Sequence, residues 1–215
     1  MREIRTRRKN NFKELVFNHI YENLKLYIVV IIIFLIGIVA GVIFINNVNE
    51  TQLIEIQNYI NSFVNSLKTD SHIDKIELLK NSIGDNLILI VSMWFIGSTV
   101  IGIPIVLGIV LFRGFCIGFT VSSIIGVLGV QKGMLFLFTT VFLQNLIFIP
   151  VIVCMAVSCI KLYKSIMKDK RRENIKLEII RHTIISIMLF LFLVIASLIE
   201  VYISSNLFIL TLKYF

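Results

Sequence analysis

Long runs of apolar residues without a charge dominate this 215-residue sequence. Residues 26–45 and 87–112 contain no Asp, Glu, Lys or Arg. A helix needs roughly 20 apolar residues to cross the hydrocarbon core of a bilayer. Hydrophobic residues make up 57% of the chain and charged residues only 16%, against roughly 25% charged in a soluble domain. The sequence therefore predicts an all-α integral membrane protein, and it excludes a disordered chain or a disulfide scaffold.

Five transmembrane helices are expected, and the rest of the chain is divided among four segments outside the bilayer. The predicted spans are residues 26–45, 87–112, 114–130, 133–160 and 183–202. The outer segments are residues 1–25, 46–85, 161–181 and 203–215. Arg113, Gln131 and Lys132 are the only polar breaks between the three central spans, so they set those boundaries. No A-x-A cleavage site follows the first span, which we interpret as an uncleaved anchor.

The distribution of basic residues predicts the orientation in the cell membrane. Residues 1–25 hold seven Lys and Arg against three acids, and residues 161–181 hold eight against three. Residues 46–85 hold six acids and three lysines. By the positive-inside rule the N-terminus and the 161–181 loop are cytoplasmic, whereas the 46–85 segment and the C-terminus are extracytoplasmic. Five crossings satisfy this arrangement. No aromatic-interleaved basic patch points to a nucleic-acid partner, so the expected surroundings are the lipid bilayer.

Residues 46–85 form the only sizeable segment expected outside the membrane. Apolar residues recur there at spacings of three and four, which predicts an amphipathic helix; they are Leu53, Ile56, Ile60, Phe63 and Leu67. Ile73, Ile76 and Ile83 indicate a second short helix. Forty residues are too few for an independent enzymatic domain. The segment either packs on the outer rim of the spans or docks an extracytoplasmic partner, and the two roles are compatible.

No catalytic, cofactor-binding or metal-binding constellation is found. His19, His72 and His182 lie in separate segments outside the predicted spans, without metal-ligand spacing. Cys116, Cys154 and Cys159 all fall inside spans and are interpreted as small apolar residues. No phosphate-binding loop, nucleophile elbow or zinc-protease motif is present. We therefore predict a protein that is not an enzyme.

Small residues form a stripe along the third predicted span. Gly114, Gly118, Ser122 and Gly126 repeat every four residues and so share one helix face. Gly37 and Gly41 make a shorter version in the first span. Such stripes let helix backbones approach closely. The face packs either within this bundle or on another protein or another copy of the chain, so self-association is one expectation.

The two prolines and a pair of amides are the other unusual features inside the spans. Pro104 and Pro150 each remove a backbone hydrogen bond and are expected to kink their helices. Gln144 and Asn145 lie just before Pro150 and must find partners at bilayer depth, across helices or on the backbone freed by the kink. Broken helices also form substrate sites in transporters. A permease, or the membrane subunit of an ATP-driven exporter, is therefore the alternative function.

An ordered set of short motifs resembles the stage II sporulation protein M family. The motifs follow a basic start, a single anchor and an exterior helical segment, and they extend over almost the whole chain. They are Met93-Trp94 with Gly97, Ile101-Gly102-Ile103-Pro104, Arg113-Gly114, Gly118-Phe119-Thr120-Val121, Gln144-Asn145-Leu146-Ile147, Ile149-Pro150 and Glu200. Each motif alone is weak, but their order, spacing and total length are specific.

The resemblance implies a role in engulfment, when the mother-cell membrane migrates around the forespore. The family's expected partners are stage II sporulation proteins D and P, the two cell-wall hydrolases. The chain itself is then a non-enzymatic scaffold that localises these hydrolases at the sporulation septum and the engulfing membrane. No catalytic residue is carried over from the family, which agrees with the absence of a catalytic constellation.

Overall fold

The chain folds into a bundle of long helices. A computed structural model describes residues 21, 23–69, 75–99, 101–168, 172–204 and 206–207, and its regular elements are all helical, as predicted. In chain order they are α2 (Leu24–Asn46), α3 (Glu50–Thr69), α4 (Lys75–Gly97), α5 (Gly102–Leu128), α6 (Val130–Leu137), η1 (Phe138–Phe142), α7 (Leu143–Lys168), α8 (Arg172–Ile199) and η2 (Glu200–Ser204), where η marks π-helical turns.

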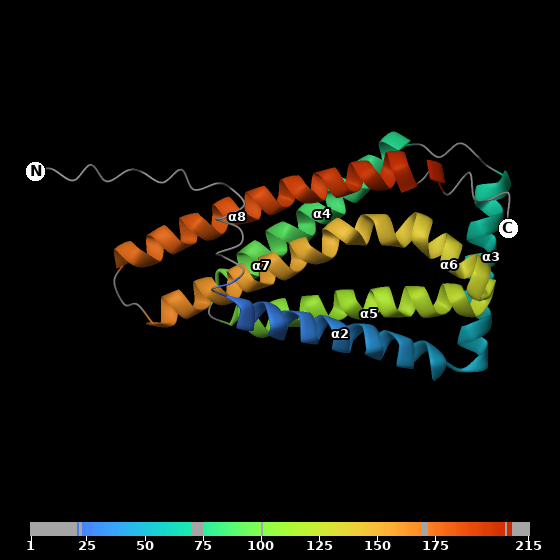
Figure 1. Ribbon diagram of the computed structural model, residues 1–215, viewed down its shortest axis with the longest axis horizontal. Helices are drawn as coiled ribbons and strands as arrows, with labels where there is room; N and C mark the ends of the chain where they lie inside the picture. The colour runs from blue at the N-terminus through green and yellow to red at the C-terminus, as the bar shows by residue number, and fades with distance from the viewer. Residues whose placement is uncertain are drawn as a thin grey trace, which may run out of the picture.

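Five of these helices lie side by side and alternate in direction along the bundle, whereas α3 lies across one end (Figure 1). We call the end crossed by α3 the α3 end, and the opposite end, where α2 and α8 begin, the basic end. α6, η1 and α7 follow one another without a break, so that residues Val130–Met167 form one bent rod. α7 packs at the centre of the bundle, where its residues Ile152, Met155 and Val157 are almost completely buried.

Among the residues that the structure describes, four helical stretches are long and apolar enough to cross a membrane: Leu24–Asn46, Gly102–Leu128, Val130–Met167 and Ile175–Ile203. α4 is not among them, because four of its first eleven residues are charged: Lys75, Glu77, Lys80 and Asp85. The predicted division into spans at 87–112 and 114–130 is wrong. α5 runs unbroken through Arg113, and the chain instead turns between Gly97 and Gly102.

Local hydrogen bonds explain why the chain turns there. The hydroxyls of Ser98 and Thr99 donate to the carbonyl oxygens of Trp94 and Ile96, at 2.7 Å each, and so satisfy acceptors at the end of α4. Pro104 occupies the third position of α5, where the backbone N–H has no partner within the helix in any case. The kink predicted at Pro104 is therefore wrong, and this proline lies in the first turn of a helix.

The predicted exterior segment differs from the structure in two ways. Residues 75–85 do not form a separate short helix, because they are the first turns of α4. In α3 the side chains of Ile60 and Val64 pack against Ile124 of α5 and Phe136 of α6, whereas Leu53 and Phe63 of the predicted apolar face are exposed. Phe136 reaches this contact because the chain turns sharply between α5 and α6. The turn is made by Gly129 alone, whose φ of 78° is a conformation that glycine adopts readily.

α2 and α5 make the closest helix pair in the bundle. A Cβ atom on Gly114 or Gly118 of α5 would overlap carbonyl oxygens of α2, those of Phe34 and Ile38. The reverse holds for Gly37 and Gly41 of α2, which face the carbonyl oxygens of Leu111 and Phe115. The two small-residue repeats thus face each other, which is the geometry that lets membrane helices pack backbone to backbone.

Candidate functional site

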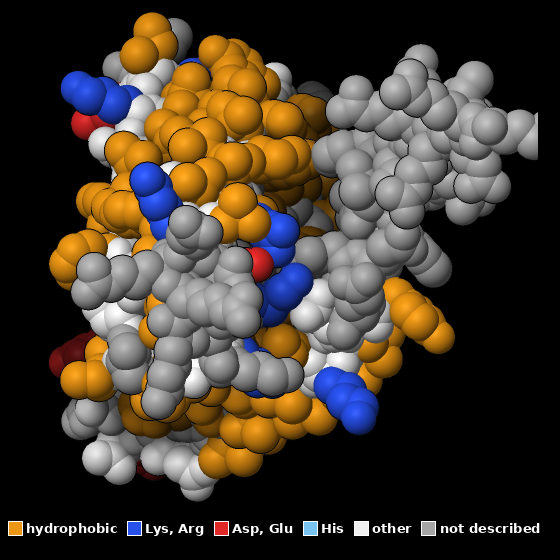
Figure 2. Space-filling view, turned by 90° about the vertical axis from the view of Figure 1, so that its left-hand side faces the viewer, with side chains coloured by type: hydrophobic (Ala, Val, Ile, Leu, Met, Phe, Trp, Pro, Cys, Tyr) orange, Lys and Arg blue, Asp and Glu red, His pale blue; other side chains and the backbone are white. Residues whose placement is uncertain are grey.

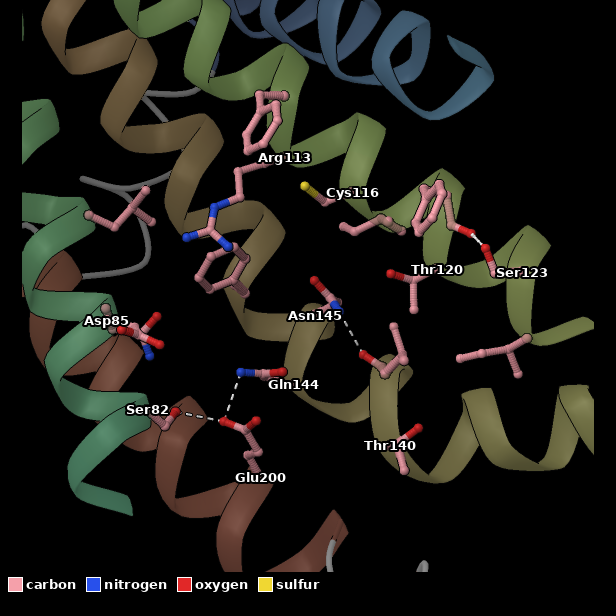
Figure 3. Close-up of a pocket in the computed structure, with 18 of the residues that line it drawn as sticks. Ser82, Asp85, Arg113, Cys116, Thr120, Ser123, Thr140, Gln144, Asn145 and Glu200 are labelled. Carbon is pink, nitrogen blue, oxygen red and sulfur yellow. Dashed lines mark hydrogen bonds between the residues drawn. The ribbon is translucent and has the colours of Figure 1, made fainter. Parts of the chain in front are cut away.

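A cleft of about 1650 Å³ lies between α4 and α5. α7 forms its floor, and Ile56, Tyr59, Ile60 and Phe63 of α3 line it at one end. Its volume exceeds the roughly 300–1,000 Å³ of a site for a drug-sized molecule. Ten polar or charged side chains around it are labelled in Figure 3: Ser82, Asp85, Arg113, Cys116, Thr120, Ser123, Thr140, Gln144, Asn145 and Glu200.

Hydrogen bonds between helices concentrate on Glu200. Its Oε2 atom accepts from Ser82 Oγ of α4 at 2.6 Å and from Gln144 Nε2 of α7 at 2.8 Å (Figure 3). Next to it, Asn86 Nδ2 donates to Ser197 Oγ at 2.9 Å. These contacts join α4, α7 and the end of α8 at the wall of the cleft. Such bonds between membrane helices substitute for the water that these groups lack.

The two predicted intramembrane amides have different partners. Gln144 bonds across helices to Glu200, whereas Asn145 Nδ2 donates to the carbonyl oxygen of Val141 in its own chain segment at 2.8 Å. Pro150 lies inside α7, and the carbonyl that its missing N–H leaves free is that of Leu146. Neither amide bonds to that carbonyl, because their hydrogen bonds go to Glu200 and Val141.

Among the described residues that line the cleft, Arg113 is the only Lys or Arg. It is half-buried at the middle of α5, and its Cζ atom lies 5.1 Å from the centroid of the Phe148 ring on α7. This distance allows a cation–π interaction. Within the described part of the chain, the only ion pair joins Arg181 and Glu178, far from the cleft in sequence, at 2.7 Å. The Arg113 guanidinium therefore points into the cleft with an aromatic ring, not a carboxylate, beside it (Figure 3).

The predicted small-residue face does not line this cleft. Gly114 and Gly118 pack on α2, as described above, and a Cβ atom on Gly126 would meet open space. Sequence reasoning also assigned Arg113 to a boundary between spans, and it gave no role to Ser82, Asp85 or Asn86. In the continuous helix α5, the 3.6-residue period places Arg113 on the side opposite to α2. The sequence analysis divided this helix at Arg113, so it could not predict on which side Arg113 lies.

Comparison with known proteins identifies the family. The family model for stage II sporulation protein M matches residues 30–205. The chain belongs to the stage II sporulation protein M family. It is therefore a sporulation-related membrane protein, and its long apolar helices agree with this assignment. The resemblance inferred from the sequence motifs is confirmed. No curated protein and no solved structure matches the chain.

Several motifs that carry the resemblance to the stage II sporulation protein M family meet in the cleft. Arg113 comes from α5, Gln144 and Asn145 from α7, and Glu200 from η2, directly after α8. They are separated by more than 30 residues in sequence, from Arg113 to Gln144 and from Asn145 to Glu200, and converge on the two walls and the floor of the cleft. The cleft is therefore the candidate functional site of this family member.

His182 and two cysteines lie in the packed part of the bundle, outside the cleft. His182 lies within α8, which begins at Arg172, and it is 2% exposed, with Nδ1 2.8 Å from Ser158 Oγ; its place outside the spans stays a prediction. Cys154 Sγ lies 3.5 Å from the hydroxyl of Tyr27. In the part of the chain that the structure describes, no three His, Cys, Asp or Glu side chains are grouped to hold a metal ion. His19 and His72 lie outside the described residues.

Proposed function

We propose that this protein is a non-enzymatic membrane scaffold that anchors and localises peptidoglycan hydrolases during forespore engulfment. The observation that carries the proposal is the family match over residues 30–205. The partners proposed are stage II sporulation proteins D and P, and the location proposed is the septum and the engulfing membrane. The crosswise helix α3 supports a docking role, because Ile54 and Tyr59 on it are exposed at one end of the bundle.

We further propose five crossings, with the basic end in the cytoplasm. Lys and Arg side chains gather on that end (Figure 2), and Lys25, Lys164, Lys176 and Arg181 are exposed there. The alternating direction of the five long helices supports α4 as the fifth crossing, since its polar residues Ser82 and Asn86 bond to α8 and η2 and are not left in lipid. The α3 end then faces the compartment in which the hydrolases act.

This orientation predicts which engineered cysteines react from outside the cell. In a chain with Cys116, Cys154 and Cys159 replaced, a cysteine at position 59 is expected to react with a membrane-impermeant maleimide in intact cells. A cysteine at position 164 is expected to react only after the membrane is permeabilised, because it lies at the opposite end of the bundle. Labelling at position 164 in intact cells, with position 59 protected, would contradict the orientation.

The scaffold role predicts the proteins that co-purify with a tagged copy from detergent-solubilised membranes of sporulating cells. We expect the two wall hydrolases to be enriched. Ile54→Asp on the exposed side of α3 is expected to reduce their recovery several-fold, because a charge there opposes an apolar contact. Leu177→Asp, at an exposed residue of the basic end, is the matched control and is expected to leave recovery unchanged. Enrichment of an ATP-binding subunit without hydrolases would overturn the scaffold role.

A further inference from the structure

The cleft extends along one face of α5 for a length close to the thickness of a bilayer core. Its lining residues on α5 recur at three- and four-residue spacings from Ile105 to Ile124. At 1.5 Å per residue this face is about 28 Å long, close to the roughly 30 Å of the hydrocarbon core. Arg113 lies near its middle. A helix face of this length that meets a cleft instead of a neighbouring helix has room for an elongated molecule.

Most polar side chains of the lining lie in one half of the cleft, which apolar residues such as Ile124 and Phe136 also line, and Ser92 lies in the other half. Between Arg113 and the α3 end, the lining includes Asn81, Ser82, Thr120, Gln144 and Glu200. Between Arg113 and the basic end, the lining from α5 is apolar, formed by Ile105, Gly108, Ile109 and Phe112. Ile88 on α4 and Ile105 and Phe112 on α5 are also exposed, so the rims of the cleft are apolar on both walls. This division matches a molecule with a polar head and an apolar body.

Opposite charges stand on opposite walls of the polar half. Arg113 projects from α5, whereas Asp85 of α4 lies across the cleft, on the same side as Glu200 (Figure 3). Arg113 and Asp85 do not form an ion pair, since the pair at Arg181 is the only one among the described residues. Charges held apart across a cleft with low-dielectric walls attract a ligand that carries both signs. A phosphate suits the guanidinium, and an ammonium group suits the carboxylate.

We propose that the cleft binds one zwitterionic phospholipid with a primary amine in its headgroup. The phosphate faces Arg113, the ammonium group faces Asp85, and the acyl chains occupy the apolar half and the opening between the rims. The site does not depend on the scaffold role, because no contact with a hydrolase is needed to form it.

A transmembrane helix from a partner protein is the other class of occupant, and α3 argues against it. A spanning helix must leave the membrane at both faces, but α3 closes the cleft at its polar end, where Ile56, Tyr59 and Phe63 line it. A lipid needs no exit past α3, because its headgroup ends within the cleft, at Arg113 and Asp85. The separated charges also match a headgroup that carries both signs better than they match an apolar helix.

The proposal predicts selective lipid binding by the full chain. Delipidated protein in detergent is titrated by native mass spectrometry with phosphatidylethanolamine, phosphatidylglycerol and phosphatidylcholine. We expect phosphatidylethanolamine to bind most tightly, because the quaternary amine of phosphatidylcholine donates no hydrogen bond and phosphatidylglycerol has no amine. Arg113→Gln is expected to weaken both phosphatidylethanolamine and phosphatidylglycerol at least about tenfold. Asp85→Asn is expected to weaken phosphatidylethanolamine most and to leave phosphatidylglycerol, which has no cationic group, unchanged.

Three comparisons decide the outcome. Lys132→Gln, at an exposed lysine outside the cleft, is expected to bind all three lipids as the wild type does. Arg113→Lys keeps the charge and is expected to restore part of the affinity, which separates recognition from a folding defect.

Equal binding of the three lipids, or unchanged binding by Arg113→Gln, would overturn the site. Tight binding of soluble phosphoethanolamine would replace the lipid by a free headgroup. A photoreactive residue at position 88 that cross-links to protein instead of lipid would favour a partner helix.

Discussion

Gly118→Leu is expected to destabilise the bundle more than any other single change at the predicted small-residue face. A Cβ atom at this position overlaps the carbonyl oxygen of Ile38, which is backbone and has no rotamer to escape into. The two helices must therefore move apart along the interface that also contains Gly37, Gly41 and Gly114. Overpacking of this kind typically lowers the free energy of unfolding by about 1–3 kcal/mol, and a contact with rigid backbone places the effect at the upper end.

The measurement is the free energy of unfolding in detergent micelles, followed by helix content against denaturant. Gly126→Leu is the matched control, because it makes the same substitution on the same helix at a position with open space around it. Its expected effect is within about 0.5 kcal/mol. Equal destabilisation by both variants would show that α2 does not hold Gly118. A Gly118→Leu protein that is fully stable but loses a partner would instead assign this face to an intermolecular contact.

The glycine repeats illustrate what the sequence contains and what it leaves open. A four-residue repeat is a local pattern, so it predicts that Gly114 and Gly118 share a helix face that tolerates close approach. The identity of the helix on that face is set by the whole bundle. The sequence interpretation consequently left open whether the partner was another helix of this chain or another protein, and the structure places α2 there.

The division into spans failed for a physical reason that concerns Arg113. A charge usually marks the end of a membrane span, because burying it in lipid is costly. Here Arg113 points into the cleft, with its guanidinium over the Phe148 ring. The true turn at Ser98 and Thr99 carries no charge, and its hydroxyls bond to the backbone of α4. The candidate site residue and the missed boundary thus both depend on the cleft, which no local pattern in the sequence reveals.

His182 and α3 show the same limit on a smaller scale. The charges around His182 indicated a cytoplasmic loop, yet α8 extends through them, and the imidazole packs beside Ser158. In α3 the spacing of apolar residues predicted an amphipathic helix. Which side of that helix is buried depends on the positions of Ile124 and Phe136, and these residues are distant in sequence. By contrast, the fold class and the family were predictable, since both depend on composition and on motifs that are contiguous in the chain.

Gln144→Leu is expected to destabilise the protein by about 2 kcal/mol, whereas Asn145→Leu is expected to have a much smaller effect. Gln144 donates to Glu200 from another helix, and Glu200 also accepts from Ser82. Removing the amide leaves a half-buried carboxylate with one fewer donor, and hydrogen bonds to charged groups contribute about 1.5–3 kcal/mol. Asn145 bonds only to the carbonyl oxygen of Val141 among the contacts described, so its loss disturbs no other helix.

The same unfolding measurement compares these two neighbouring amides, which have the same chemistry and similar burial. Glu200→Gln serves as the coupling test, because it keeps the shape of the side chain but removes the charge. If Gln144 acts through Glu200, the Gln144→Leu change is expected to be smaller in the Glu200→Gln background than in the wild type. Equal effects of Gln144→Leu in both backgrounds, or equal effects of the two amide substitutions, would contradict this hydrogen bond as the link between α7 and the end of α8. A positive coupling would establish that the polar wall of the cleft is one of the contacts that join α7 to the chain after α8, so that a change at this wall alters the cleft and the stability of the bundle together.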